Sequence, residues 1–259
     1  QVIMKRRSFV KTTILSTAAA TILPQFGFAE SNHKKQNPMY YELRTYTLKD
    51  ANQQKLVEEY FEKAAIPALN RLGVRNVGVF TELNPSSQST LLALLPFESL
   101  QAFESVNSKL EQDKDYLSSA SAYLSAAATA PAYERIQSSL LKAFSHMPGL
   151  ELPGKGKPIF ELRRYEHASE AAGTKKREMF NDAGEIDIFK RLGFKPVFFG
   201  ETIIGDHRPN LIYMVTFDDM AAHDQRWKAF AGDPEWKKIS AIPEYADSKL
   251  VSKITATFL

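Results

Sequence analysis

The sequence predicts an α+β fold in which two tandem copies of one β-α-β-β-α-β module pack sheet to sheet. Two observations support this prediction. Segments about 120 residues apart resemble each other, and each copy shows strand and helix patterns in the same order. The chain of 259 residues, 44% of them hydrophobic, is long enough to form two ordinary domains with a core each.

The internal repeat is collinear. YELRTY at 41–46 recurs as FELRRY at 160–165, and RLG at 71–73 recurs at 191–193. The block 91–102 also recurs, 120 residues later. Because chance explains one such match but not several in the same order, we infer a duplication.

Each copy is expected to contain four strands and two main helices. The first copy shows strand patterns at 40–48, 77–83, 90–95 and 133–144. Its first helix can be capped by Asp50, bent by Pro67 and ended by Gly73. A second helix is expected from about 97, followed by an Ala/Ser-rich helical stretch to about 128. The second copy shows strand patterns near 159–166, 196–204, 210–217 and 246–258, helices near 169–192 and 218–231, and a short helix that starts at Pro234 behind the cap Asp233. This order is that of the ferredoxin-like unit. Since one face of each four-stranded sheet lacks helices, we expect the two units to cover each other as a pseudo-twofold α/β barrel.

The expected domain boundaries come from these patterns and from composition. They are a signal peptide at 1–29, a linker at 30–38, module 1 at 39–144, a Pro/Gly-rich linker at 145–158 and module 2 at 159–259.

The first 29 residues have the pattern of an export signal. Arg6 and Arg7, followed by Phe9 and Lys11, precede an uncharged apolar stretch that is too short to span a bilayer comfortably. The RRxFxK order resembles a twin-arginine signal and predicts a periplasmic or otherwise exported protein, with no membrane span after cleavage. The alternatives are an ordinary secretory signal and an uncleaved N-terminal anchor.

Charge and composition exclude several functional classes. Of the 33 Lys and Arg residues, four lie in the predicted signal, which leaves 29 against 30 Asp and Glu, so nothing in the charge favours nucleic-acid binding. The chain has no cysteine. We find no metal-binding spacing among His167, His207 and His223, although they can still converge in space, and no phosphate loop or nucleophile elbow. The sequence therefore predicts no metal and no cofactor.

The YELRTY strand, the helix ending in RLG, the hydrophobic hairpin and the DPEW segment at 233–236 resemble the NIPSNAP family, part of the wider dimeric α/β-barrel group. The first copy departs from this pattern, with DKDY at 113–116 in place of DPEW. The resemblance implies the ferredoxin-like fold and barrel pairing, and no settled activity. Barrel relatives include small oxygenases, isomerases and haem-degrading enzymes.

The first strand of each copy carries a polar triad on one face. The triads are Glu42, Arg44 and Tyr46 in module 1, and Glu161, Arg163 and Tyr165 in module 2. We expect the apolar faces of these strands to meet the helices and the triads to point toward the sheet-to-sheet interior or its mouth. Arginine and tyrosine there can form an anion pocket. The alternative is that Glu and Arg form buried pairs with a purely structural role.

Differences between the copies are a further indication of a site. At an offset of 120 residues, His223 replaces Phe103. Tyr213, Trp227 and Trp236 likewise stand opposite the residues Ala93, Asn107 and Tyr116. These side chains are either core residues or parts of a site kept in module 2 alone.

Two functional hypotheses are consistent with these patterns. The first is an exported binding or accessory module for a small acidic or aromatic ligand. The second is a small barrel-type enzyme, an oxygenase or isomerase without a cofactor or a haem-handling protein, with its site mainly in module 2. No catalytic residue can be assigned from the sequence, and a homo-oligomer is a further candidate assembly.

Overall fold

A computed structural model describes residues 37–84, 89–154 and 156–259. The signal expected over 1–29 and most of the linker at 30–38 therefore lie outside the described residues. None of the described helices has the length and apolar character needed to cross a membrane.

Both modules have the predicted β-α-β-β-α-β order. Module 1 consists of β1 (Tyr40–Leu48), α1 (Ala51–Tyr60), the π-helical turn η1 (Phe61–Ala65), α2 (Ile66–Arg71), β2 (Gly78–Thr81), β3 (Ser89–Phe97), α3 (Leu100–Leu110), α4 (Lys114–Ser119), α5 (Ser121–Leu124) and β4 (Arg135–Ala143). Module 2 consists of β5 (Ile159–His167), α6 (Glu170–Asn181), α7 (Glu185–Arg191), β6 (Lys195–Ile204), β7 (Asn210–Phe217), α8 (Met220–Gly232), α9 (Pro234–Ser240), the 3₁₀ turn η2 (Pro243–Tyr245), α10 (Asp247–Leu250) and β8 (Val251–Phe258). The strand expected from residue 246 starts only at Val251, because α10 occupies the preceding positions.

The predicted helix ends are confirmed. The Asp50 side chain accepts hydrogen bonds from two backbone N–H groups at the start of α1, and Asp233 does the same for α9. Gly73, with φ of 87°, adopts the left-handed conformation that ends a helix. Pro67 lies in the first turn of α2, directly after η1, where its missing N–H is tolerated.

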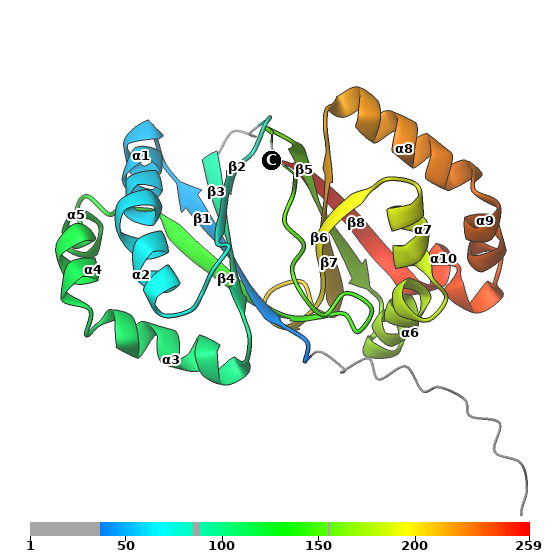
Figure 1. The fold of residues 1–259 in the computed structure, drawn as a ribbon, viewed down its shortest axis with the longest axis horizontal. Coiled ribbons are helices and arrows are strands. Elements are labelled where there is room, and N and C mark those ends of the chain that lie inside the picture. The colour runs from blue at the N-terminus through cyan, green and yellow to red at the C-terminus, as the bar shows by residue number, and fades with distance from the viewer. Residues whose placement is uncertain (1–36, 85–88, 155) are drawn as a thin grey trace, which may run out of the picture. The chain divides into compact units, whose positions relative to one another are not determined.

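The eight strands form one antiparallel sheet in the order β2-β3-β1-β4-β6-β7-β5-β8. β4 pairs with β6 and so joins the two modules. The sheet curls until its outer strands meet, where the Leu83 N–H donates to the Phe258 carbonyl over 2.9 Å. Helices α1–α5 lie outside one half and α6–α10 outside the other (Figure 1). The predicted fold class is therefore confirmed.

The interior of the curled sheet is apolar and is built by both modules. Tyr41 and Leu43 of β1 lie there in one cluster with Phe198 and Met214 of module 2. The ring centres of Tyr41 and Phe198 are 5.0 Å apart. Each module thus covers the helix-free face of the other, which is the physical role expected of the duplication.

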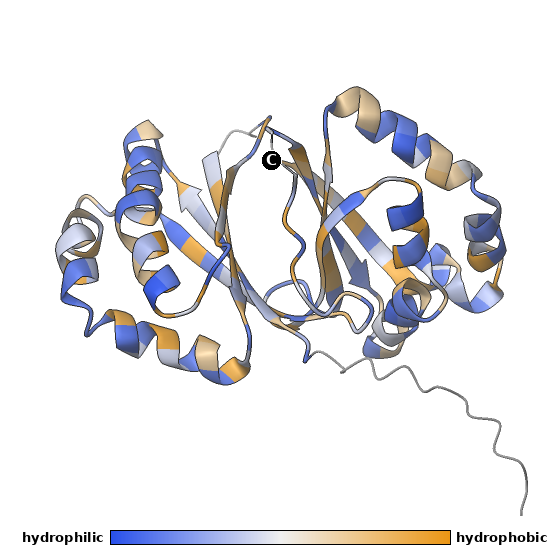
Figure 2. Ribbon diagram, in the orientation of Figure 1, coloured by the Kyte–Doolittle hydropathy of each residue, from blue (hydrophilic) through white to orange (hydrophobic). Residues whose placement is uncertain are grey.

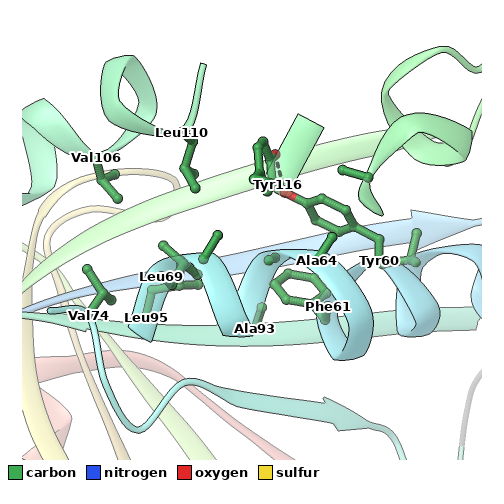
Figure 3. Close-up of a cluster of buried hydrophobic side chains, with 14 of the residues drawn as sticks. Tyr60, Phe61, Ala64, Leu69, Val74, Ala93, Leu95, Val106, Leu110 and Tyr116 are labelled. Atoms are coloured by element: carbon green, nitrogen blue, oxygen red, sulfur yellow. Dashed lines mark hydrogen bonds between the residues drawn. The ribbon is translucent and has the colours of Figure 1, made fainter. Parts of the chain in front are cut away.

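A second layer of core lies between each half-sheet and its helices. In module 1, Phe61, Leu69 and Val106 pack on Ala93 and Leu95 of β3 (Figure 3). The helices of both modules interleave hydrophilic and hydrophobic residues, as expected of helices with one face on a sheet (Figure 2).

Candidate functional site

The two polar triads face the helices, so the prediction that they point into the barrel is wrong. Tyr46 belongs to the helix-side core of module 1 and Tyr165 to that of module 2, whereas Tyr41 and Leu43 line the interior. Both faces of each half-sheet are buried, and the apolar interior is a poor environment for the triads. The helices supply polar partners for the triads, and the triads therefore face the helices rather than the interior.

Glu161 is the centre of the triad in module 2. Its side chain is 1% exposed and accepts hydrogen bonds from Arg163 Nη1 at 2.6 Å and Trp227 Nε1 at 2.9 Å. The guanidinium carbon of Arg163 lies 4.5 Å from the centre of the Trp227 ring. His223 Nε2 lies 3.5 Å from Glu161 Oε2. The structure therefore brings these predicted residues together.

Two tyrosines connect this network to a buried lysine. Arg163 Nη2 donates to the Tyr165 hydroxyl over 3.3 Å, and that hydroxyl lies 3.4 Å from the hydroxyl of Tyr213. Burial raises the pKa of Tyr213 well above its usual value. Lys176 Nζ lies 5.5 Å from the centre of the Tyr165 ring and 5.8 Å from the centre of the Trp236 ring. Trp236 is another of the candidate site residues predicted in module 2.

Lys176 is fully buried beside two carboxylates. Its Nζ lies 3.0 Å from Asp247 Oδ1 and 3.9 Å from Glu185 Oε2. Burial opposes the charge on Lys176, but the two carboxylates outweigh it and raise its pKa. Burial raises the pKa of the Glu185 carboxyl to about 7, although Lys176 lowers it. We call the residues Glu161, Arg163, Tyr165, Lys176, Glu185, Tyr213 and Trp227 the module 2 polar cluster.

The module 2 polar cluster is closed. Glu161, Lys176 and Tyr213 are each at most 1% exposed. Arg163 pairs with Glu161, and Lys176 pairs with Glu185 and with Asp247 outside the cluster, although Arg163 Nε and Glu185 Oε2 form no hydrogen bond within the described residues. This arrangement matches the structural alternative, in which Glu and Arg neutralise each other, more closely than it matches a preformed anion pocket.

The triad of module 1 is separate and simpler. Arg44 pairs with Glu42 at 2.8 Å, and Ser138 of β4 also donates to Glu42. Tyr46 packs edge-on against Phe61 and Tyr133. The two triads therefore do not share a cavity, because each is enclosed in the helix layer of its own module.

A pocket opens instead on the inner side of the sheet, near the place where β2 and β8 meet. It has a volume of about 150 Å³. Its lining residues are Leu43, Thr45, Glu82, Leu92, Leu162, Arg164, Ile212, Thr255 and Thr257. We call it the barrel-mouth pocket. Apolar walls from both modules and a few polar groups are typical of a site for a small organic ligand.

Arg164 and Thr255, which line the barrel-mouth pocket, and Glu166, which pairs with Arg164, each have a buried polar atom without a hydrogen bond to any described residue. Arg164 Nε, Glu166 Oε1 and Thr255 Oγ1 form no hydrogen bond within the described part of the chain. Arg164 Nε and Glu166 Oε1 lie 3.3 Å apart and attract each other only as charges. A ligand with a polar end can satisfy such atoms, whose burial without a partner is otherwise unfavourable.

Arg164 was not among the predicted residues, although the repeat contains a signal for it. Arg164 replaces Thr45 in the best-matching segment, on the otherwise apolar face of the strand. Lys176 was missed in the same way. It occupies a position of α6 between the buried residues Ala172 and Met179, at the place of Val57 in the first copy.

Among the described residues, no group of three or more His, Asp or Glu side chains could hold a metal ion. His207 lies 3.5 Å from Glu166, and His223 Nδ1 lies 2.8 Å from Asp224. His207 and His223 therefore contact different carboxylates, and His167 Nδ1 lies 2.9 Å from the Leu250 carbonyl oxygen, so the three do not converge on one point.

Comparison with known proteins gives a family and a fold. The NIPSNAP family model matches residues 41–148 and again 160–259. No curated protein matches the chain significantly. A solved "putative monooxygenase" from Lactobacillus acidophilus is similar over 86% of this chain and 93% of its own, with 10% identity and a TM-score of 0.58. A second, from Fusobacterium nucleatum, has 10% identity and a TM-score of 0.56 over 86% of this chain and 92% of its own. A NIPSNAP family protein of unknown function from Agrobacterium tumefaciens has 18% identity and a TM-score of 0.34 over 41% of this chain and 89% of its own.

Proposed function

This chain belongs to the NIPSNAP family, and from that premise we propose that it is a binding module for a small acidic or aromatic molecule. The observation that carries the proposal is the barrel-mouth pocket, where apolar walls surround Arg164, whose Nε lies 3.3 Å from Glu166 Oε1 but forms no hydrogen bond with the described residues. A carboxylate can accept from the guanidinium while an apolar body fills the space between Leu92, Leu162 and Ile212.

The first experiment is titration calorimetry with benzoate, a small aromatic acid. We expect Arg164→Thr, which restores the residue of the first copy, to weaken benzoate binding about tenfold or more, since a hydrogen bond to a charged group contributes about 1.5–3 kcal/mol. Benzyl alcohol, which keeps the ring but carries no charge, should bind both proteins equally.

The matched control is Arg191→Thr, which removes one charge from the helix surface where Arg191 pairs with Asp233 and Glu235. It should leave benzoate binding unchanged. If Arg164→Thr and Arg191→Thr bound benzoate as tightly as the wild type, or if the wild type bound none, the proposal would be wrong.

We also propose that the protein is exported through a twin-arginine signal, on the basis of the RRxFxK order at residues 6–11. The combined changes Arg6→Lys and Arg7→Lys should keep the full-length chain inside the cell, because the pathway reads the arginine pair. Cell fractionation with immunoblotting measures this. Unchanged export of the double variant would instead support an ordinary secretory signal.

A second candidate function is a barrel-type enzyme with its site in module 2. The observation that favours it is the Glu185 carboxyl, whose pKa is raised to about 7 by burial, in the range useful for proton transfer. Oxygen uptake with small aromatic substrates tests the oxygenase form of this hypothesis, and Glu185→Gln should abolish it. The closed packing of the module 2 polar cluster makes binding at the barrel mouth the better-supported function.

A further inference from the structure

A second, smaller pocket lies in module 2, at the start of α6 and on the outer side of the β6–β7 hairpin. Its volume is about 60 Å³. Its lining residues are His167, Glu170, Gly173, Thr174, Arg177, Glu201, Thr202, Arg208, Pro209, Asn210 and Leu211. We call it the His167 pocket. It shares no lining residue with the barrel-mouth pocket, so a ligand here is independent of the proposed function.

His167 offers an unused hydrogen-bond acceptor to this pocket. The side chain is buried, with 6% of the residue exposed, and its Nδ1 lies 2.9 Å from the Leu250 carbonyl oxygen. Because a carbonyl can only accept, Nδ1 carries the hydrogen. Burial lowers the pKa of His167 more than the hydrogen bond to Leu250 raises it, which favours the neutral ring. Nε2 therefore holds a lone pair, and it has no partner among the described residues.

Gly173 allows the His167 ring to pack closely against the first turns of α6. A Cβ atom at position 173 would lie 3.1 Å from Cδ2 of His167, the carbon bonded to Nε2. Glycine is unfavourable inside a helix such as α6, and the close approach of the His167 ring explains it here, because an alanine methyl group would crowd that ring.

The floor of the His167 pocket supplies acceptors and few donors. Thr202 Oγ1 donates to Asn210 Oδ1 over 2.6 Å, and Asn210 Nδ2 donates to the Asp206 carbonyl. The hydroxyl hydrogen of Thr202 is therefore used, while its oxygen can still accept. A group bound at the floor must donate a hydrogen bond, as a hydroxyl does.

The rim carries two guanidiniums and two carboxylates, from Arg177, Arg208, Glu170 and Glu201. Arg177 is neutralised by Glu201, with which it forms an ion pair. Arg208 is exposed, and no carboxylate of the described residues lies within ion-pair distance of it. Glu170, the first residue of α6, also lines the pocket, and its carboxylate offsets the partial positive charge of that helix N-terminus. A carboxylate at the rim therefore meets the guanidinium of Arg208.

We propose that the His167 pocket binds a short hydroxy acid, with the hydroxyl donating to Nε2 of His167 and the carboxylate next to Arg208. The volume limits the ligand, because 60 Å³ holds about four to six water-sized groups. Glycolate has a suitable size. The first copy has no such site, since Leu48 stands at the position of His167 in β1 and is fully buried.

The experiment monitors the ring nitrogens of His167 by long-range ¹H–¹⁵N correlation in histidine-labelled protein. Glycolate should move the Nε2 resonance upfield, as expected for a lone pair that accepts a hydrogen bond. Acetate lacks the hydroxyl and ethylene glycol lacks the carboxylate, so neither should shift Nε2 at the same concentration. If glycolate leaves Nε2 unmoved, or if acetate and ethylene glycol shift it equally, the proposal is overturned.

Two substitutions test the site, and a third serves as the control. Arg208→Ala changes only an exposed side chain and should weaken glycolate binding about tenfold. Gly173→Ala should weaken glycolate binding, because its methyl group would crowd the His167 ring and displace Nε2 from its position in the pocket. Arg191→Ala, at the end of α7, serves as the control for a lost charge and should bind glycolate as the wild type does. Unchanged glycolate affinity in Arg208→Ala would contradict the assignment of the rim.

Discussion

Replacing Glu161 by alanine is expected to lower the free energy of unfolding by about 3–5 kcal/mol. The change removes the acceptor of both Arg163 and Trp227 and leaves the Arg163 guanidinium without its charge partner in the helix layer. A partly buried cation without a counter-charge is far less favourable than the intact pair. Urea unfolding followed by tryptophan fluorescence measures the loss, since Trp227 reports on this contact directly.

The corresponding change in module 1, Glu42→Ala, is the internal control. Glu42 also pairs with an arginine, but it accepts from Ser138 rather than from a tryptophan, and its side chain is 8% exposed rather than 1%. We expect a smaller loss, of about 1–3 kcal/mol. An equal loss in both modules would show that the additional contacts in module 2 contribute nothing to stability.

Glu185→Gln is expected to stabilise the protein at about pH 8.5 and to leave stability nearly unchanged at about pH 4.5. The folded-state pKa of Glu185, about 7, is raised above its usual value of 4.5 by burial. The contribution of Glu185 to the free energy of unfolding is therefore fully present below its usual pKa, and it is lost as the pH rises through the folded-state pKa. At about 1.4 kcal/mol per pH unit, the loss is about 3 kcal/mol, and glutamine, which does not ionise, avoids it.

Urea unfolding of wild type and variant at both pH values checks this result, and the difference between the two proteins isolates Glu185 from other titrating groups. Asp187→Asn, a change on the same helix that is outside its buried face, should give no such pH-dependent difference. If Glu185→Gln destabilised the protein at the higher pH, the charged carboxylate would instead be stabilised by Lys176, contrary to the raised pKa.

The repeat made the fold predictable, because two copies of one pattern restrict the topology more strongly than one copy does. β1 occupies the predicted residues 40–48, and β7 the predicted residues 210–217. The orientation of the triads was not predictable in this way. Strand alternation identifies two faces but does not say which face meets the helices when both are buried.

The site residues that were not predicted share one property. Arg164, Lys176 and Glu185 are charged residues at positions where the first copy has uncharged ones, Thr45, Val57 and Ala65. Only the fold shows which of them are enclosed together and which line a pocket. Lys176 and Glu185 are enclosed in the helix layer, whereas Arg164 lies at the barrel mouth.

A small acid is proposed to bind inside the barrel mouth and not in the helix layer of module 2. Nuclear magnetic resonance of methyl-labelled protein titrated with benzoate tests it most directly. We predict shifts of the methyl groups of Leu92, Leu162 and Ile212 and unchanged indole N–H signals of Trp227 and Trp236, which both lie in the helix layer. Shifted indole signals with unmoved methyl groups would place the site in the module 2 polar cluster and contradict this claim.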